Sequence, residues 1–327
     1  MSELALLTLA AFVLDLLFGD PAYPLHPIRL TGRWIDVLER GLRRFGLGGI
    51  AGGWLLAITT VGTLLALFLV LSAAAERLHP WAGRVFHLYV LYSCLALEDL
   101  IRHVRPVAHR LKAGDLPGAR LALSRVVGRD TAALDRWGVG RAAVETLAEN
   151  FVDGFLSPLF WILAGGVLAQ PFGLPAVPTA VCAVLSFKAA STLDSMVGYR
   201  NARYDRFGRA GARLDDLMNF LPARLSVPVL FLGAALSGLR AADGFRVALR
   251  DRLEHDSPNA AHAESFAAGA LGVRLGGPTR YGGTPKDKAW LGSGTTEVDE
   301  RHVLETVTLI RRSSWVVMLA PLCSLAF

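Results

Sequence analysis

The sequence contains only three cysteines, Cys94, Cys182 and Cys323, and each lies inside an apolar stretch without a C-x-x-C partner. This spacing supports neither a zinc site nor a disulfide framework. It predicts that the thiols are small apolar packing groups. The chain also lacks a G-x-x-x-x-G-K-[ST] phosphate loop, a strand–G-x-G-x-x-G–helix unit and an H-E-x-x-H motif. If the protein uses ATP, its nucleotide site is therefore of another kind.

Charge is scarce as well, because Asp, Glu, Lys and Arg make up 19% of the 327 residues while hydrophobic residues make up 53%. The mean hydropathy of +0.41 is high for a soluble globular protein. The block Ile50–Ala75 is long enough to cross about 30 Å of hydrocarbon. We therefore predict one all-α membrane domain over 1–327, a polytopic integral membrane helical bundle whose cytoplasmic loops and helix ends carry function. Its apolar helices are expected near 3–19, 50–76, 85–101, 155–170, 174–190, 225–239 and 313–327.

The first apolar block has neither a basic segment before it nor an A-x-A cleavage site after it, so it is interpreted as a retained helix or anchor. Lys and Arg are concentrated in the long polar segments 20–49, 102–150, 188–224 and 240–312. This distribution follows the positive-inside rule and argues against nucleic acid as a partner, despite the net charge of +6. It places these segments in the cytoplasm and the N-terminus outside.

One block conflicts with this topology. If 225–239 crosses fully, the basic segment 240–312 lies outside. Pro222 and Pro228 flank or interrupt the block, so we expect a re-entrant or surface-lying segment, or a further poorly marked crossing. Elsewhere, Asp115 is a candidate N-cap for a helix over 117–127. The apolar periodicity predicts a helix over 131–150, and the Gly- and Pro-rich segment 276–296 is expected to be a loop.

The stretch ETLAENFVDGFLSPLFW places carboxylates directly before an apolar block. Glu145, Glu149 and Asp153 follow one another at four-residue spacing, so they share one helix face, with Asn150 beside them. A solvated helix end, with Arg141 and Glu145 paired, would explain Glu145. It explains Asp153 poorly, since an unpaired charge at a membrane boundary is costly. Oxygen ligands near phosphates are typical of Mg²⁺ sites.

Three further clusters carry candidate groups. Lys188, Thr192 and Ser195 share a helix face that suits a phosphate. The alternative is that Lys188 only extends its ammonium to the membrane interface, as lysines near the ends of apolar helices commonly do. In GARLDDLMNFLPARLS, Arg213 and Arg224 lie on either side of three side chains with oxygen atoms: Asp215, Asp216 and Asn219. These three are either a second set of oxygen ligands or part of a solvated, capped helix. In HDSPNAAHAESFAAGALG, Asn259 and Glu264 are the candidate groups, and Ser257 caps the following helix.

The sequence resembles the CobD/CbiB family, the adenosylcobinamide-phosphate synthases of cobalamin biosynthesis. Four segments carry the resemblance, in the family's order: GDPAYPLHPIRLTGRWI, RAAVETLAENFVDGFLSPLFW, KAASTLDSMVGYRNARYDRFGRAGARLDDLMNFLPARL and DSPNAAHAESFAAGALGV. Together they cover nearly the whole chain. Ser191, Ala261 and Ala263 depart from the family's usual Asn, Gly and Pro, and none of these changes removes a charged group.

The resemblance implies a carbon–nitrogen ligase that uses ATP and Mg²⁺. Such an enzyme joins adenosylcobyric acid, a corrinoid, to (R)-1-aminopropan-2-ol phosphate or a related amino alcohol and gives adenosylcobinamide phosphate. It implies an inner-membrane, multi-pass protein whose active site faces the cytoplasm, near other membrane-bound enzymes of the pathway. A transporter and a membrane sensor on the same helical scaffold are the alternatives.

This chemistry suggests roles for the candidate residues. The carboxylates expected to bind Mg²⁺ are Glu149, Asp153, Asp215 and Asp216. Glu149, Asp153, Lys188 and Glu264 are the expected catalytic residues, with Glu264 accepting the ammonium proton. The residues expected to hold nucleotide or phosphates are Asn150, Thr192, Ser195, Arg203, Arg213, Asn219, Arg224 and Asn259. We expect the acidic and basic groups to gather into one magnesium–nucleotide pocket at the cytoplasmic mouth of the bundle.

Overall fold

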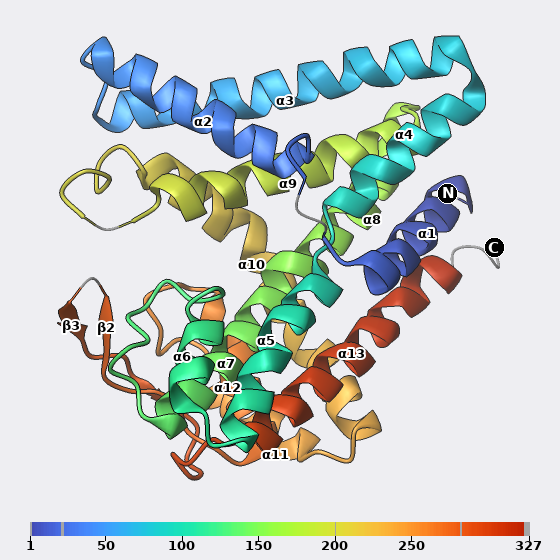
Figure 1. Cartoon of the computed structure of the whole chain (residues 1–327). Coiled ribbons are helices and arrows are strands. Elements are labelled where there is room, and N and C mark those ends of the chain that lie inside the picture. Colours follow the sequence, from blue (N-terminus) through green and yellow to red (C-terminus); the bar gives the residue numbers. More distant parts are fainter. Residues whose placement is uncertain (1, 21–22, 200, 282, 324–327) are drawn as a thin grey trace. The chain divides into compact units, whose positions relative to one another are not determined.

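The computed structural model describes residues 2–20, 23–199, 201–281 and 283–323 (Figure 1). Helices form most of this part of the chain, and the strands within it are four pairing segments of two or three residues each. The protein is therefore all-α, as the sequence predicted. The described chain falls into two compact units. The prediction of a single domain stays a prediction.

The first unit comprises residues 1–96, 157–219 and 320–327. Its central helix is α9 (Ala176–Val197), which contacts most of the other helices of the unit. The others are α1 (Ser2–Phe18), α2 (Pro27–Arg44), α3 (Ile50–Leu78), α4 (Pro80–Ser93), α8 (Ser157–Ala169) and the first part of α10 (Arg209–Leu236). Pro27 and Pro80 open α2 and α4, where the N–H that proline lacks has no partner within the helix.

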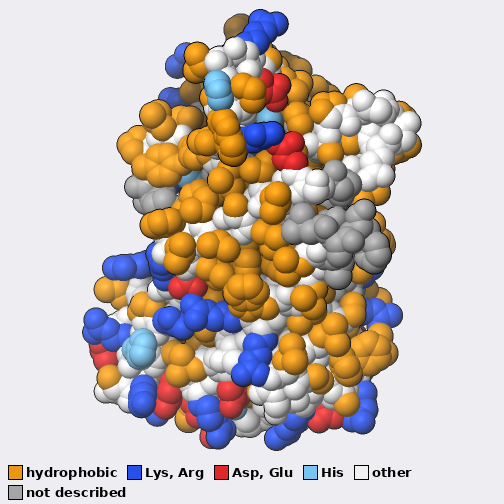
Figure 2. Space-filling view, turned by 90° about the vertical axis from the view of Figure 1, so that its right-hand side faces the viewer, with side chains coloured by type: hydrophobic (Ala, Val, Ile, Leu, Met, Phe, Trp, Pro, Cys, Tyr) orange, Lys and Arg blue, Asp and Glu red, His pale blue; other side chains and the backbone are white. Residues whose placement is uncertain are grey.

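Much of the apolar surface of α3 is exposed. Ile58, Val70 and Leu67 are 66%, 66% and 55% exposed, although they lie in the middle of a 29-residue apolar helix. Four helical segments of the described chain are long and apolar enough to cross a membrane: Ile50–Leu78, Arg136–Phe172, Ala176–Val197 and Arg209–Leu236. Figure 2 shows wide areas of hydrophobic side chains on the face that it draws. Surfaces of this kind are stable in hydrocarbon and not in water, so the chain is an all-α polytopic membrane protein.

The second unit comprises residues 97–156 and 220–319. It contains α5 (Leu97–Lys112), α6 (Leu116–Leu123), α7 (Arg136–Phe151), a π-helical turn (Val152–Leu156), the later part of α10, α11 (Ala241–Asp251), α12 (Ala260–Leu271) and most of α13 (Glu300–Cys323). Strands β1 (Leu275–Gly276) and β4 (Trp290–Leu291) pair antiparallel, with Leu275 opposite Leu291. Strands β2 (Thr279–Tyr281) and β3 (Thr284–Lys286), which lie between β1 and β4 in the sequence, form a second antiparallel pair.

Helix α12 is the interior helix of the second unit, and each of its residues is buried. It packs against α7, α11, β1 and β4. Its small residues allow this close packing: a Cβ on Gly269 would lie 2.5 Å from the Asp243 carbonyl oxygen at the start of α11. A helix that is buried on all sides is expected to be apolar all round. Glu264 and His262 are therefore unusual residues within it.

Several predicted boundaries are wrong. The block 85–101 is two helices, α4 and α5, separated at 94–96. Residues 225–236 of the block 225–239 form the second half of the continuous helix α10, which includes Pro222 and Pro228, so the block is neither a separate short helix nor a re-entrant turn. Helix α10 is long and apolar enough for a further crossing, the other alternative. The helix expected over 131–150 begins at Arg136, and the one expected over 117–127 ends at Leu123. The segment 276–296, expected to be a loop, contains the short strands. Of the block 313–327, residues 324–327 lie outside the described chain.

The start of α6 is as predicted. Asp115 is its N-cap, and its Oδ1 accepts a hydrogen bond from the Gly118 N–H at 2.9 Å. Helix α7 begins in the same way, with the Asp135 Oδ1 accepting from the Gly138 N–H at 2.6 Å. These caps satisfy donors that have no partner within the helix. The cap at Asp135 therefore fixes the register of α7, and with it the position of the glutamates that α7 carries.

Candidate active site

Five ionisable side chains lie together in the interior of the second unit. Glu145 and Glu149 lie on α7, Glu264 on α12, Arg129 before α7, and Lys288 between β3 and β4. The side chains of Glu145, Arg129 and Lys288 are 1%, 10% and 11% exposed. Charged groups are costly to bury and are rarely buried unless they are paired or functional. Their concentration marks these five side chains, hereafter the glutamate cluster, as the candidate site.

Glu145 joins three segments of this unit. Its Oε2 accepts a hydrogen bond from the Arg129 Nη2, and its Oε1 accepts one from the Gly276 N–H at 2.7 Å. It lies one helical turn before Glu149, so both carboxylates of α7 face the same side. A buried ion pair is stable only when further hydrogen bonds satisfy its lone pairs. The Gly276 N–H supplies one and so ties β1 to α7.

The structure corrects the interpretation of Glu145 as part of a solvated helix end. Glu145 is buried, and its ion-pair partner is Arg129 rather than Arg141. The guanidinium of Arg141 donates instead to the Thr296 carbonyl oxygen at 2.7 Å and lies 5.5 Å from the centre of the Trp290 ring. The spacing of four residues was therefore not sufficient evidence for an ion pair, because the tertiary structure supplies a better-placed cation.

Glu264 is the most unusual member of the cluster. It is 1% exposed, and its Oε1 has no hydrogen-bond partner among the described residues. Burial raises the pKa of Glu264 well above its ordinary value, and the neighbouring Glu149 raises it further. A carboxyl group with a raised pKa holds its proton at higher pH than an exposed one. It can therefore exchange a proton with a weakly acidic group such as an ammonium.

The surrounding groups determine the charge of the cluster. Burial lowers the pKa of Lys288, but Glu264 and Glu145 raise it by more, so Lys288 remains an ammonium. Burial and the nearby Lys288 lower the pKa of His255 to about 4, so the imidazole is neutral near pH 7. The site therefore combines a neutral imidazole and two cations with three carboxyl groups, one of which, Glu264, has a raised pKa. Such an arrangement can bind an anion and move a proton.

Other predicted residues of the second unit lie near the ends of the same helices. Asn150 donates from its amide to the Thr146 carbonyl oxygen at 3.0 Å. Asp153 lies in the π-helical turn, a feature frequent at functional sites. Asn259 is buried just before α12, where the Ser257 hydroxyl accepts from its backbone N–H at 3.3 Å. Arg224 instead donates to the Phe220 carbonyl oxygen and stacks on the Phe220 ring.

The predicted phosphate group on α9 lies in the first unit. The hydroxyl of Thr192 donates to the Lys188 carbonyl oxygen at 2.6 Å, and that of Ser195 donates to the Thr192 carbonyl oxygen at 3.0 Å. Both hydroxyl protons are therefore used within the helix, and each oxygen remains able to accept. Lys188 is half-buried, with its ammonium 6.0 Å from the centre of the Phe187 ring.

The remaining predicted residues also lie in the first unit. The Arg203 guanidinium pairs with Glu39 at 3.0 Å, and Arg213 is exposed. Asn219 is buried, accepts from the Ser157 hydroxyl at 2.5 Å and donates to the Asp215 carboxylate at 3.1 Å, so it links α8 and α10. Asp216 is half-buried on α10. The predicted single pocket would draw residues from both units, and it stays a prediction.

Sequence reasoning missed Arg129, Lys288 and His255. Arg129 precedes the cap of α7 without any motif, and Lys288 lies in a segment that was interpreted only as a loop. The available signal for Lys288 was its place in TPKDKAW, where a lysine two residues before a tryptophan interrupts a Gly-rich connection. Loops on a rigid scaffold often carry functional groups. The segment 276–296 was therefore a better candidate for carrying a site residue than its Gly- and Pro-rich composition suggested.

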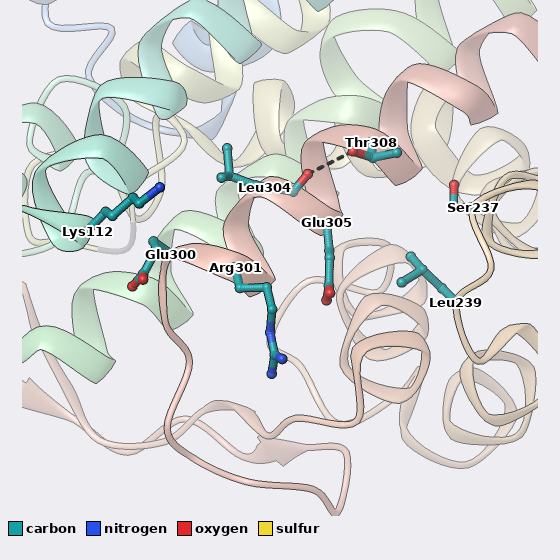
Figure 3. A pocket seen from close by; sticks show the side chains of 8 residues that line it. All are labelled: Lys112, Ser237, Leu239, Glu300, Arg301, Leu304, Glu305 and Thr308. Atoms are coloured by element: carbon teal, nitrogen blue, oxygen red, sulfur yellow. Dashed lines mark hydrogen bonds between the residues drawn. The ribbon is translucent and has the colours of Figure 1, made fainter.

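A separate groove of about 350 Å³ lies along α13 in the second unit (Figure 3). Arg301 and Glu305 project from the helix, and Lys112 at the end of α5 is also part of the lining. The groove contains both signs of charge on exposed or half-buried side chains. Because it lacks the buried, convergent groups of the glutamate cluster, it is the weaker candidate for chemistry.

Comparison with known proteins identifies the family of this chain. A family model described as CobD/Cbib protein matches residues 8–310. The chain belongs to the CobD/CbiB family. It is 43% identical over 317 residues to cobalamin biosynthesis protein CobD of Pelobacter propionicus, which covers 97% of this chain and 94% of that protein. No solved structure matches it.

Two further members of the CobD/CbiB family show a similar relationship. Cobalamin biosynthesis protein CobD of Geobacter metallireducens is 42% identical over 98% of this chain and 96% of its own length. Cobalamin biosynthesis protein CbiB of Salmonella choleraesuis is 38% identical over 97% of each chain. The resemblance found in the four sequence segments is therefore confirmed at the level of the family and over nearly the whole length.

Proposed function

We propose that this protein acts in cobalamin biosynthesis as an ATP-dependent, amide-forming ligase, an adenosylcobinamide-phosphate synthase. Its substrates would be adenosylcobyric acid and (R)-1-aminopropan-2-ol phosphate or a related amino alcohol. Membership of the CobD/CbiB family and the names of its relatives support the pathway. The observation that carries the chemistry is Glu264, a fully buried carboxyl group with a raised pKa beside two buried cations.

The proposed reaction has two steps. A carboxylate oxygen of the corrinoid attacks the γ-phosphorus of ATP, and the bond from this phosphorus to the β–γ bridging oxygen breaks. ADP departs, and the corrinoid now carries an acyl phosphate. Glu264 then takes one proton from the substrate ammonium, and the freed amine attacks the acyl carbon. The carbon–oxygen bond to phosphate breaks, and the departing phosphate carries away the second proton. A base with a raised pKa suits the first proton transfer, because an ordinary glutamate is too weak a base.

Mg²⁺ would accompany the nucleotide. Among the described residues, no three His, Cys, Asp or Glu side chains are arranged to hold a metal ion. Mg²⁺ commonly takes only one or two protein carboxylates and completes its shell with water and phosphate oxygens. Glu149 and Asp153 in the second unit, or Asp215 and Asp216 in the first, would supply such a pair. Bound Mg²⁺ would neutralise charge on the transferring phosphoryl group.

The cellular setting is also a proposal. We place the protein in the inner membrane as a multi-pass protein with the glutamate cluster facing the cytoplasm, where ATP and the corrinoid are available. The basic segments 102–150 and 240–312 carry the cluster, and the positive-inside rule supports a cytoplasmic position for them. Other membrane-bound enzymes of the pathway would be its neighbours in the bilayer.

The direct test uses protein purified in detergent and supplied with adenosylcobyric acid, (R)-1-aminopropan-2-ol phosphate, ATP and Mg²⁺. We expect the amide product by mass spectrometry, and none when ATP is left out. Ethanolamine phosphate and unphosphorylated aminopropanol, offered separately, identify the amino alcohol that the site prefers. An Asp153→Asn variant tests the assignment of that carboxylate. Folded protein that forms no amide with any of these amines would contradict the proposal.

A further inference from the structure

The segment between β1 and β4 carries two lysines in contrasting environments. The Lys286 side chain is 45% exposed, and its ammonium pairs with Asp256 at 2.5 Å. The Lys288 side chain, two residues later, is 11% exposed and belongs to the glutamate cluster. An ammonium has three donors and is strongly hydrated, so burial is favourable only when acceptors replace water. The contacts of Lys288 therefore show whether the protein itself supplies those acceptors.

The closest ion pair of Lys288 is a long one. Among the described residues it is formed with the Glu145 Oε2 at 3.9 Å, which is beyond hydrogen-bond distance. That oxygen already accepts from Arg129, and the Glu145 Oε1 accepts from the Gly276 N–H. Glu145 is thus engaged in holding Arg129 and β1. It contributes long-range attraction to Lys288 without satisfying the donors of its ammonium.

A second observation points to a ligand at the same place. The Glu264 Oε1 is buried and has no hydrogen-bond partner among the described residues, and Glu264 interacts electrostatically with Lys288. Two neighbouring buried groups therefore have unused hydrogen-bonding capacity. Buried polar groups are almost always paired in a folded protein, and exceptions commonly mark a functional role. A bound oxyanion would accept from the ammonium.

The backbone holds Lys288 in place from both ends of its segment. Gly276 and Gly292 adopt left-handed conformations with φ of 81° and 84°, which favour glycine. Their N–H groups donate to the Glu145 Oε1 and to the Asp251 Oδ2, each at 2.7 Å. Asp251 is buried at the end of α11. Two carboxylates on rigid helices therefore anchor the segment, as expected of a preorganised binding residue.

We propose that Lys288 binds an oxyanion of the substrate, a carboxylate or phosphoryl oxygen, beside Glu264, and that Glu145 is the positioning residue that holds its segment. The identity of this anion rests on the proposed function: it would be the corrinoid carboxylate or the phosphoryl group transferred to it. Lys288 supplies the positive charge that this group requires. Arg129 stays paired with Glu145 throughout.

The test compares Lys288→Met with Lys286→Met, which removes the same charge from an exposed position of the same segment. The probes are inorganic phosphate and propionate, titrated separately at constant ionic strength, with binding followed by the fluorescence of the nearby Trp290. We expect Lys288→Met to weaken binding of at least one probe by about 10- to 100-fold, the range of a charged hydrogen bond. Lys288→Arg should restore most of it, and Lys286→Met should bind as the unmodified protein does.

A second measurement needs no variant. The unmodified protein is treated with an amine-reactive acetylating reagent, with and without each probe, and peptides are analysed by mass spectrometry. We expect the effective probe to protect Lys288 and not Lys286. Equal labelling of Lys288 with and without both probes, or unchanged binding by Lys288→Met, would overturn the proposal. Because neither readout requires turnover, failure of the ligase assay with anion binding intact would contradict only the proposed function.

Discussion

Glu264 lies on a helix composed largely of alanine, where an apolar residue would be more stable. Its burial favours the protonated form and raises its pKa, while Lys288 and Arg129 limit the rise. The protein thus bears a cost in folding stability at a position that stability alone would not select. Such trade-offs are typical of active sites, where a strained or destabilised group is retained for its chemistry.

Replacement of this residue by glutamine gives the first prediction. Glu264→Gln should lower amide formation by about 100-fold or more, since it removes the proton acceptor. The folded-state pKa of Glu264 is raised, so its contribution to stability is complete below the ordinary pKa near 4.5 and is lost as pH rises through the folded pKa. Glutamine resembles the protonated form at every pH. The variant should therefore gain thermal stability over the unmodified protein as pH rises above 4.5.

Thermal unfolding in detergent over a pH series checks this expectation, and product mass checks the activity. A difference in melting temperature that stays constant with pH would contradict the raised pKa of Glu264. Full activity of the variant would remove Glu264 from the proposed mechanism. Glu254→Gln, an exposed change shortly before the same helix, is the matched control and should alter neither measurement.

At the residue scale, the sequence named Glu149 as part of a carboxylate stripe before an apolar block, and Glu264 as a candidate group of HDSPNAAHAESFAAGALG. Glu149 is half-buried and Glu264 is buried, and both belong to the glutamate cluster. Arg129 and Lys288 could not be recognised in the same way, since they lie in polar connections where basic residues are ordinary. Their burial depends on contacts with α7, a helix that is distant in sequence from Lys288. Single-residue patterns do not contain this information.

At the scale of elements, Glu145 connects α7 with β1 and with the chain before α7. The second prediction is that Glu145→Gln destabilises the protein by about 3–5 kcal/mol, because it leaves the Arg129 guanidinium buried without its anion. The double variant Glu145→Leu with Arg129→Met should be less destabilised than Glu145→Leu alone. Chemical denaturation of the single and double variants measures the coupling. Additive effects would contradict a buried ion pair at this position.

The packing of α8 on α9 gives the third prediction. A Cβ on Gly165 would lie 2.8 Å from the Ala180 Cα and 2.8 Å from the Ala183 Cβ, so these two helices approach closely at this point. Gly165→Ala should therefore destabilise the first unit by about 1–3 kcal/mol through overpacking. Gly62→Ala on α3 is the control, because a Cβ there meets no atom within 4 Å.

Thermal unfolding in detergent distinguishes the two glycine variants. We expect a lower melting temperature for Gly165→Ala and an unchanged or higher one for Gly62→Ala, since alanine favours the helix. Equal melting temperatures would show that α8 and α9 do not approach as closely as described. The comparison therefore tests a helix contact that membrane proteins commonly build from small residues.

Element boundaries were predicted less well than element types. The apolar blocks marked the helices, but α10 continues through Pro222 and Pro228, which were expected to limit it. Prolines within an apolar helix are tolerated where neighbouring groups satisfy the freed carbonyls. The helix expected to begin near 155 is the later part of a longer helical segment, Arg136–Phe172, which begins before the carboxylates. Hydropathy records which side chains are apolar and does not record which polar ones are covered by protein.

For the whole molecule, composition and charge distribution predicted an all-α membrane protein, and the four long apolar helices of the described chain agree. The family resemblance in four segments supplied the function that we propose, since no residue pattern alone indicates a corrinoid substrate. The site could be predicted only in part. Glu149 and Glu264 were named as candidates from the sequence, whereas their burial and the cations that accompany them depend on the folded chain.

The central claim is that ATP activates the corrinoid carboxylate as an acyl phosphate for amide formation, and isotope transfer tests it most directly. Adenosylcobyric acid carrying ¹⁸O in its propionate carboxylate is supplied with ATP, Mg²⁺ and (R)-1-aminopropan-2-ol phosphate to the purified protein. We predict the amide product together with inorganic phosphate that contains one ¹⁸O atom from each carboxylate. Label in AMP, label released to water, or the absence of the amide would contradict the mechanism.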